Sequence, residues 1–193
     1  MEKILVSACL MGFAVRYNGS DKLLISRTLA RWREEKRLVV HCPELAAGLH
    51  TPRLPAEIHG GSAEQVLTGN AQILESDGRD VTQHYVLAAW LALRAAQAGQ
   101  CRFALLTDGS PTCGSRKIYD GSFSGQQIFG NGVAAALLRQ HGIDAFAEAQ
   151  LPALIQRVDA ADKCLVVDAG RRAKAAAGLM RRSTTSPPPS GQR

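Results

Sequence analysis

The stretch Lys3-Ile4-Leu5-Val6-Ser7-Ala8-Cys9 decides the fold class. Its first five residues form a short apolar run rich in strand-forming side chains, which predicts a buried β-strand over Lys3–Ser7. Turn-forming residues follow at 18–21, and apolar side chains then recur at helical spacing up to about Lys36. The chain therefore begins with a strand followed by a helix.

The same alternation continues along the chain. Further strands are expected at Leu38–Val40, weakly at Ala71–Leu74, and at Phe103–Thr107 and Asp144–Ala147, and helices at Thr82–Ala98, Val133–His141 and Leu151–Val158. The segment 48–61 is predicted to be a loop because glycine and proline punctuate it. Strands that alternate with helices predict a single-domain, Rossmann-like α/β fold: a mostly parallel sheet with helices on both faces.

The charge is unevenly distributed. The formal net charge is +6, but the first 170 residues hold 17 basic and 17 acidic side chains, so the excess belongs to the end of the chain. We expect an α/β domain over 1–160 and a basic, Ser/Pro-rich, poorly ordered extension over 161–193, and we expect truncation after Gly170 to leave the fold intact. A neutral body argues against long nucleic acid as a partner, since phosphate contacts require clustered lysine and arginine.

Hydropathy and cysteine usage favour the cytoplasm. No apolar run approaches the roughly 18 residues that span a bilayer, and no signal segment opens the sequence, so no membrane partner is expected. The five cysteines are scattered and form no C-x-x-C pair, which is typical of reduced thiols rather than a disulfide framework.

Three of these cysteines follow predicted strands. Cys9 comes two residues after the first strand, Cys42 two residues after the second, and Cys113 lies in the loop after Phe103–Thr107. Ligands of parallel sheets bind outside the carboxyl ends of the strands, so these three thiols are predicted to meet at one rim. Cys101 and Cys164 lie away from this rim and are predicted to be structural.

Two kinds of metal site fit three thiols at a rim. A structural zinc site needs four ligands, which His41 could complete, giving a zinc-stabilised ligand-binding module without catalysis. An iron–sulfur cluster held by three cysteines leaves one iron open to a soft, sulfur-bearing substrate. Composition and spacing leave both alternatives open.

Polar neighbours of the cysteines are candidates for chemistry. Pro43 fixes the chain after Cys42, so that Glu44 can face a metal, and Ser110 precedes Cys113 in a turn-forming loop. The expected helix that begins at Val133 offers an N-terminus at which a single phosphate could bind.

Longer motifs resemble those of the thiouracil desulfidase family. They are Ser7-Ala8-Cys9-Leu10, Cys42-Pro43-Glu44 with Gly48, Pro52-Arg53, Pro55-Ala56-Glu57, Gly78-Arg79-Asp80-Val81-Thr82, Ser110-Pro111-Thr112-Cys113-Gly114-Ser115, Ile118-Tyr119-Asp120-Gly121 and Gly132-Val133-Ala134-Ala135. The resemblance covers about residues 2–158. One departure is Thr107-Asp108-Gly109, which stands where the family usually carries basic residues.

The resemblance implies a compact α/β fold and a [4Fe-4S] cluster with one open iron site, held by Cys9, Cys42 and Cys113. It also implies non-redox desulfuration of a thionated pyrimidine, with release of sulfide and with Glu44 and Ser110 as the catalytic pair. The expected partner is thus a small molecule, a thiopyrimidine base or its nucleotide.

Overall fold

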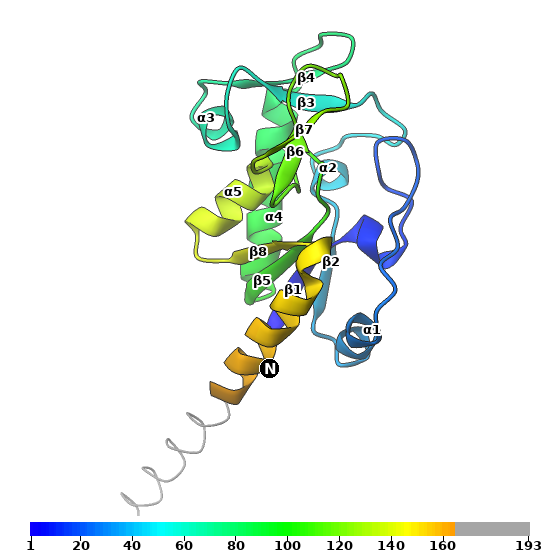
Figure 1. The fold of residues 1–193 in the computed structure, drawn as a ribbon, viewed down its shortest axis with the longest axis vertical. Helices are drawn as coiled ribbons and strands as arrows, with labels where there is room; N and C mark the ends of the chain where they lie inside the picture. The colour runs from blue at the N-terminus through cyan, green and yellow to red at the C-terminus, as the bar shows by residue number, and fades with distance from the viewer. Residues whose placement is uncertain (165–193) are drawn as a thin grey trace, which may run out of the picture.

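A computed structural model describes residues 1–164, and the predictions made for 165–193 lie outside them (Figure 1). The centre is a four-stranded sheet of β1 (Lys3–Ser7), β2 (Leu38–His41), β5 (Cys101–Leu106) and β8 (Asp144–Ala147). The strand order is β2-β1-β5-β8, and every neighbouring pair is parallel. The predicted α/β fold with a parallel sheet is confirmed.

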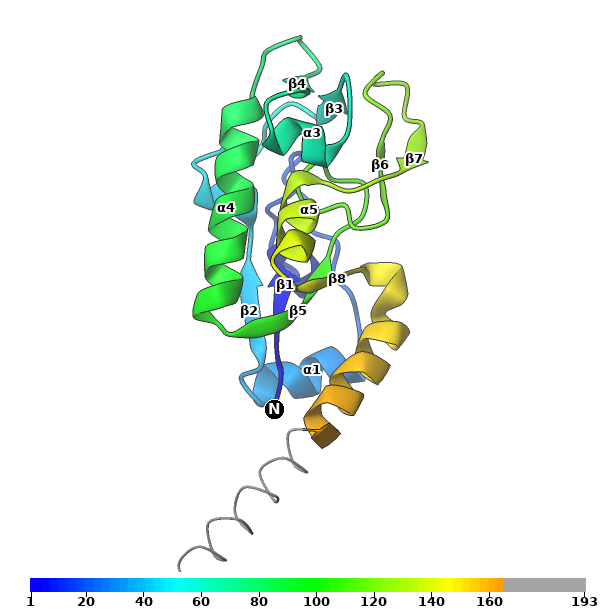
Figure 2. The same cartoon turned by 90° about the vertical axis from the view of Figure 1, so that its left-hand side faces the viewer.

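Helices cover both faces of this sheet (Figure 2). On one face lie α4 (Thr82–Ala98) and α5 (Val133–Gln140), and on the other lie α1 (Arg27–Glu34) and the helical residues 151–164. Alternation along β1 divides its side chains between the two cores: Leu5 packs with α4 and α5, whereas Ile4 and Val6 pack with α1.

Small side chains bring α4 close to its neighbours. Ala88, Ala89, Ala92 and Ala96 are almost completely buried on α4, and α5 adds a run of buried alanines at 134–136. Because alanine side chains are short, the two helices pack closely against each other and against the sheet. On the opposite face, the large ring of Trp32 on α1 fills the second core and is fully buried.

Two small antiparallel sheets stand above the carboxyl ends of the central strands (Figure 1). One pairs β3 (Ala56–His59) with β4 (Gln72–Glu75), and the other is a hairpin of β6 (Lys117–Tyr119) and β7 (Gln127–Phe129). The prediction of a loop over 48–61 is therefore wrong for its last part, because β3 occupies Ala56–His59. Shorter elements are α2 (Pro43–Ala46), α3 (Ala63–Leu67), η1 (Ala8–Met11) and η2 (Glu148–Gln150).

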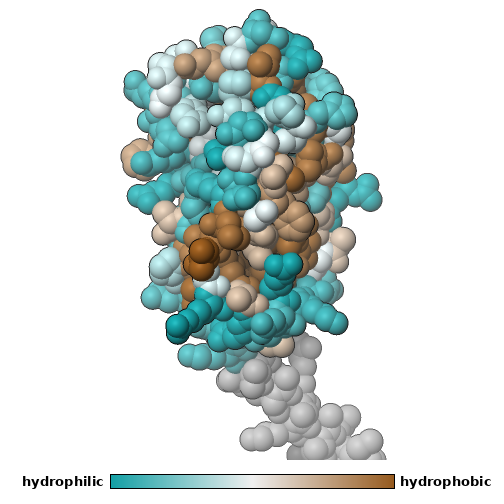
Figure 3. All heavy atoms as spheres, turned by 90° about the vertical axis from the view of Figure 1, so that its right-hand side faces the viewer, coloured by the Kyte–Doolittle hydropathy of each residue, from teal (hydrophilic) through white to brown (hydrophobic). Residues whose placement is uncertain are grey.

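The first helix begins later than its turn residues suggested. The hydroxyl of Ser26 accepts the N–H of Leu29 and caps α1, so residues 12–26 form an irregular segment instead. Figure 3 views the side on which this segment and α1 lie, and it shows an apolar area surrounded by hydrophilic side chains. Phe13, Leu23 and Ile25 of the segment are exposed.

The end of the described chain is tied to its beginning. Asp162 accepts a hydrogen bond from the backbone N–H of Glu2 at 2.6 Å. It also forms an ion pair with the buried Arg37 guanidinium at 2.7 Å. The helix of residues 151–164 therefore continues past 160 and contacts the domain through Asp162. No helix among the described residues is long and apolar enough to cross a bilayer.

Candidate active site

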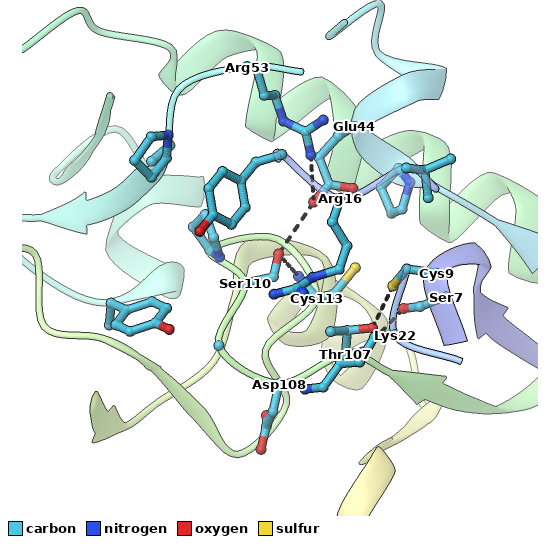
Figure 4. A pocket seen from close by; sticks show the side chains of 18 of the residues that line it. Ser7, Cys9, Arg16, Lys22, Glu44, Arg53, Thr107, Asp108, Ser110 and Cys113 are labelled. Carbon is cyan, nitrogen blue, oxygen red and sulfur yellow. Dashed lines mark hydrogen bonds and ion pairs between the residues drawn. The ribbon is translucent and has the colours of Figure 1, made fainter. Parts of the chain in front are cut away.

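A cavity of about 460 Å³ opens beside the carboxyl ends of β1 and β5, where the order in which the strands are added to the sheet reverses. The chain passes from β1 to β2 through α1 on one face, and from β5 to β8 through α5 on the other, so β1 and β5 form a topological switch point. Parallel sheets bind ligands at this point. Residues that follow β1, β2 and β5 line the cavity (Figure 4).

The cavity brings three thiols together. Cys9 lies in η1, directly after β1; Cys42 is the residue that precedes α2; and Cys113 lies in the loop after β5. All three line the cavity. Cys101 is buried in the core beside α4, and Cys164 is exposed at the end of the described helix, so neither lines it.

Burial keeps these thiols protonated when no metal is bound. It raises the pKa of Cys42 to about 12, with a further contribution from the Glu44 carboxylate. Burial also raises the pKa of Cys9, and it raises that of Cys113 well above its ordinary value, where Glu44, Cys9 and Cys42 add to the effect. Metal binding must therefore displace protons from the three sulfurs.

Buried hydroxyl groups position one of the sulfurs. Thr107 Oγ1 lies 2.8 Å from Cys9 Sγ, and the Thr107 backbone N–H donates to Ser7 Oγ at 3.2 Å. Both hydroxyl residues stand at the ends of adjacent parallel strands, β1 and β5. If Cys9 becomes a thiolate, Thr107 can only donate to it, which fixes the direction of the sulfur lone pairs.

Glu44 and Ser110 meet beside the thiols. Pro43 begins α2 and turns Glu44 inward, so its carboxylate is buried. Ser110 Oγ donates to Glu44 Oε1 at 3.3 Å, and the Cys42 thiol donates to Oε2 at 3.4 Å. The carboxylate thus connects a hydroxyl and a thiol through hydrogen bonds, and Figure 4 shows its contact with Ser110.

A cation compensates this buried acid. Arg53 Nη2 lies 3.9 Å from Glu44 Oε1, and both side chains are largely removed from water. The Arg53 backbone N–H and Nη1 are held by the carbonyl oxygens of Tyr17 and His50. A buried carboxylate needs such a partner, because an isolated charge is costly in a low-dielectric environment.

The loop that carries Ser110 and Cys113 is tightly wound. Ser110 Oγ accepts the N–H groups of Thr112 and Cys113, both at 3.1 Å, and the Ser110 carbonyl accepts the N–H of Gly114 at 2.8 Å. Gly114 has no room for a side chain, since a Cβ there would lie 2.6 Å from Lys117 O and 2.7 Å from Ser110 O. Backbone packing therefore requires glycine directly after the cysteine.

We expect Gly114→Ala to destabilise the metal-free protein by about 1–3 kcal/mol, the usual cost of forcing extra atoms into a packed site. Urea unfolding measures this free energy. Gly130→Ala is the matched control, because its Cβ would meet only side-chain carbons of Ile118, at 3.0 Å, and no backbone oxygen. Equal losses in the two variants would contradict the packing argument.

Asp108 stabilises the same loop through its carboxylate. Its Oδ1 accepts the N–H groups of Ser115, Arg116 and Lys117 at 2.9–3.1 Å. The carboxylate therefore serves as an anchor that closes the loop behind Cys113.

The expected phosphate site at the start of α5 is wrong. The N–H of Val133 donates to Pro111 O, and those of Ala134 and Ala135 donate to Thr112 O. The first turn of the helix is also completely buried. Backbone carbonyl groups of the Cys113 loop thus use the donors that a phosphate would need.

The structure does not form the four-ligand zinc site. Within residues 1–164, no three side chains of His, Cys, Asp or Glu converge closely enough to hold a single metal ion. His41 also lines the cavity; its buried Nε2 has no hydrogen-bond partner among the described residues, and burial lowers its pKa. A multi-iron cluster is larger than one ion, and three soft sulfur donors around one cavity fit its chemistry.

Several side chains that line the cavity were missed by sequence reasoning. Arg53, Glu57 and Tyr119 lie within quoted motifs, but no chemical role was predicted for them. Other lining residues, Arg16, Tyr17, Lys22, Tyr85 and Phe123, carried no recognisable signal. Most of them stand on irregular segments or hairpins whose path a hydrophobic pattern does not reveal.

Fold and site together define an α/β enzyme with a thiol-lined cavity and a buried acid–hydroxyl pair. The chain belongs to the 2-thiouracil desulfurase family, which it matches over residues 4–150. It is 46% identical over 148 residues to the uncharacterized protein YbbK of Bacillus subtilis (strain 168), covering 77% of this chain and 97% of the relative. Among solved structures it is similar to the [4Fe-4S]-dependent thiouracil desulfidase TudS, with a TM-score of 0.75, 45% identity, and coverage of 82% of this chain and 99% of that one.

Proposed function

We propose that this enzyme replaces the sulfur of a thionated pyrimidine by oxygen, consuming one water and releasing one sulfide without net oxidation or reduction. The observation that carries the proposal is that Cys9, Cys42 and Cys113 line the same cavity as the hydrogen-bonded Glu44–Ser110 pair. Family membership and the similarity to TudS support the same reaction.

The cysteines would hold a [4Fe-4S] cluster. Three protein ligands for four irons would leave one iron open, and the bound cluster would supply a Lewis acid for the thiocarbonyl sulfur. Thr107 would hold Cys9 by its hydroxyl, and the hydroxyl-capped loop of Ser110 would fix the backbone of Cys113. These contacts orient the sulfurs before any metal arrives.

Glu44 would act as the general base. Its carboxylate is buried beside the thiols and accepts from Ser110, so it is placed to take a proton from the attacking water. Ser110 can turn its hydroxyl from Glu44 towards the ring of the substrate and pass a proton there. Arg53 supplies a positive charge next to the acid throughout.

The stoichiometry of the reaction and the source of the new oxygen atom test this proposal. Anaerobically reconstituted protein should convert 2-thiouracil to uracil with one sulfide per uracil, in the absence of any electron donor. In water enriched with ¹⁸O, the label should enter the uracil. Sulfide release that requires a reductant, or an unlabelled product, would disprove a hydrolytic non-redox reaction.

Base and nucleotide substrates can be distinguished at Arg16. This half-buried arginine lines the cavity, donates to the hydroxyl of Ser20 at 3.3 Å, and has no carboxylate within ion-pair distance among residues 1–164. Lys22 also lines the cavity but is paired with Glu148. The free arginine, rather than the closed α5 terminus, is therefore the candidate partner for a phosphate.

We expect Arg16→Gln to raise KM about tenfold for a thiouridine monophosphate, because a charge-assisted hydrogen bond is lost. KM for the free thiouracil base should change little. Steady-state kinetics on both substrates check this, and the same variant should show the larger effect at low salt. An equal change for base and nucleotide would contradict a role in phosphate binding.

We also propose that the enzyme works in the cytoplasm, since its five cysteines are all free and three of them are needed as thiolates.

A further inference from the structure

Aromatic side chains gather around the cavity. All three tyrosines of the chain, Tyr17, Tyr85 and Tyr119, line it together with Phe123. Tyr85 is buried, whereas the other three aromatic residues are between 36% and 41% exposed. Large aromatic rings that stay exposed at the mouth of a cavity offer flat apolar surfaces to a planar heterocyclic ligand.

Phe123 is held there in an unfavourable backbone conformation. Its φ is +56°, in the left-handed region that residues with a side chain avoid. Strain of this kind persists only where the surroundings impose it, and it is concentrated at ligand-binding positions. The strained residue lies on the loop between β6 and β7, and it lines the cavity together with Gly125 of the same loop.

A buried carboxylate imposes the conformation. Glu57 on β3 has little contact with water, and its Oε2 accepts the N–H groups of Gly121 at 2.9 Å and Phe123 at 3.1 Å. The loop also packs closely on β3, since a Cβ at Gly121 would lie 2.4 Å from Ile58 O. Among residues 1–164 no cationic side chain lies within ion-pair distance of Glu57, and the hydrogen-bond partners of its carboxylate are these two loop N–H groups.

We propose that Phe123 determines specificity by stacking its ring on the pyrimidine ring of the substrate, and that Glu57 is the positioning residue that holds it there. This inference rests on the proposed function and extends it. Stacking on an aromatic side chain favours any flat conjugated ring, and it offers little to a puckered ring that carries the same thioamide group.

The same hairpin provides a matched control. Phe129 on β7 is 77% exposed but does not line the cavity, and Arg116 and Lys117 lie near its ring. A substitution there removes an exposed aromatic ring from the hairpin without changing the cavity.

The test uses cluster-loaded protein and two thioamides, 2-thiouracil and its non-aromatic 5,6-dihydro form. Phe123→Leu should raise KM for 2-thiouracil roughly tenfold, as expected for the loss of one stacking contact, and leave KM for the dihydro form within about twofold. Phe123→Tyr should retain the preference for the aromatic ring. Glu57→Gln should shift KM in the same direction as Phe123→Leu, and Phe129→Leu should change nothing.

Direct binding separates this inference from the reaction itself. Calorimetry with uracil and 5,6-dihydrouracil measures the same preference without turnover. If wild-type protein releases no sulfide but Phe123→Leu still weakens uracil binding selectively, the reaction is wrong and the stacking stands. Equal losses on both rings, or no loss at all, would overturn the stacking.

Discussion

Replacing Cys9, Cys42 or Cys113 by Ala is expected to abolish both the iron–sulfur cluster and desulfuration. Each substitution removes one of the three thiols that line the cavity and leaves two, whereas a [4Fe-4S] cluster is held by cysteine thiolates. The measurements are iron and acid-labile sulfide per chain after anaerobic reconstitution, the visible absorption of the protein, and the rate of uracil formation. A loss of several orders of magnitude in turnover is expected from each variant.

The remaining cysteines provide the controls. Cys101→Ala removes a buried thiol from the core beside α4, and Cys164→Ala removes an exposed one, so neither should change the iron content. The assignment of the ligands would be refuted if a control variant lost its colour while a variant of Cys9, Cys42 or Cys113 kept it.

Glu44→Gln is expected to retain the cluster and lower kcat by about 10²-fold or more, the scale typical of removing a general base. Glutamine keeps the length of the side chain and can still accept from Ser110, but it cannot take a proton. Iron content separates loss of chemistry from loss of the cluster, which matters because Cys42 also contacts this carboxylate. Glu34→Gln, on the exposed side of α1, is the control and should behave as wild type.

Full turnover by cluster-loaded Glu44→Gln would reassign Glu44 to a structural role. In that case the acid would serve only to hold Arg53 and the Cys113 loop.

The central sheet and the meeting of the three thiols could be predicted from the sequence. Strands such as Lys3–Ser7 and Asp144–Ala147 are short apolar runs with a clear beginning and end, and the structure has both at those bounds. Parallel pairing then brings residues that follow each strand to one edge, whatever their separation along the chain. The approach of Cys9, Cys42 and Cys113 follows from this rule alone.

The upper part of the cavity could not be predicted in the same way. Strands β3, β6 and β7 have only three or four residues, and all three residues of β7 are exposed, so no apolar pattern marks it. The position of Phe123 depends on hydrogen bonds to Glu57, 66 residues away. The phosphate site expected at α5 was wrong for a similar reason, since carbonyl groups of another segment fill it.

The division of the thiols between the two faces of the sheet has a consequence for how long the folded protein persists in the cell. Cys9 belongs to the core beneath α1, and Cys113 belongs to the core beneath α4 and α5. A group bound to both would act as a cross-link between the two layers, and any ligand that binds only the folded chain stabilises it by RT ln(1 + [L]/Kd). Resistance to heat and proteolysis should therefore follow iron supply and exposure to oxygen, so that cells short of iron would hold less of this enzyme at the same rate of synthesis.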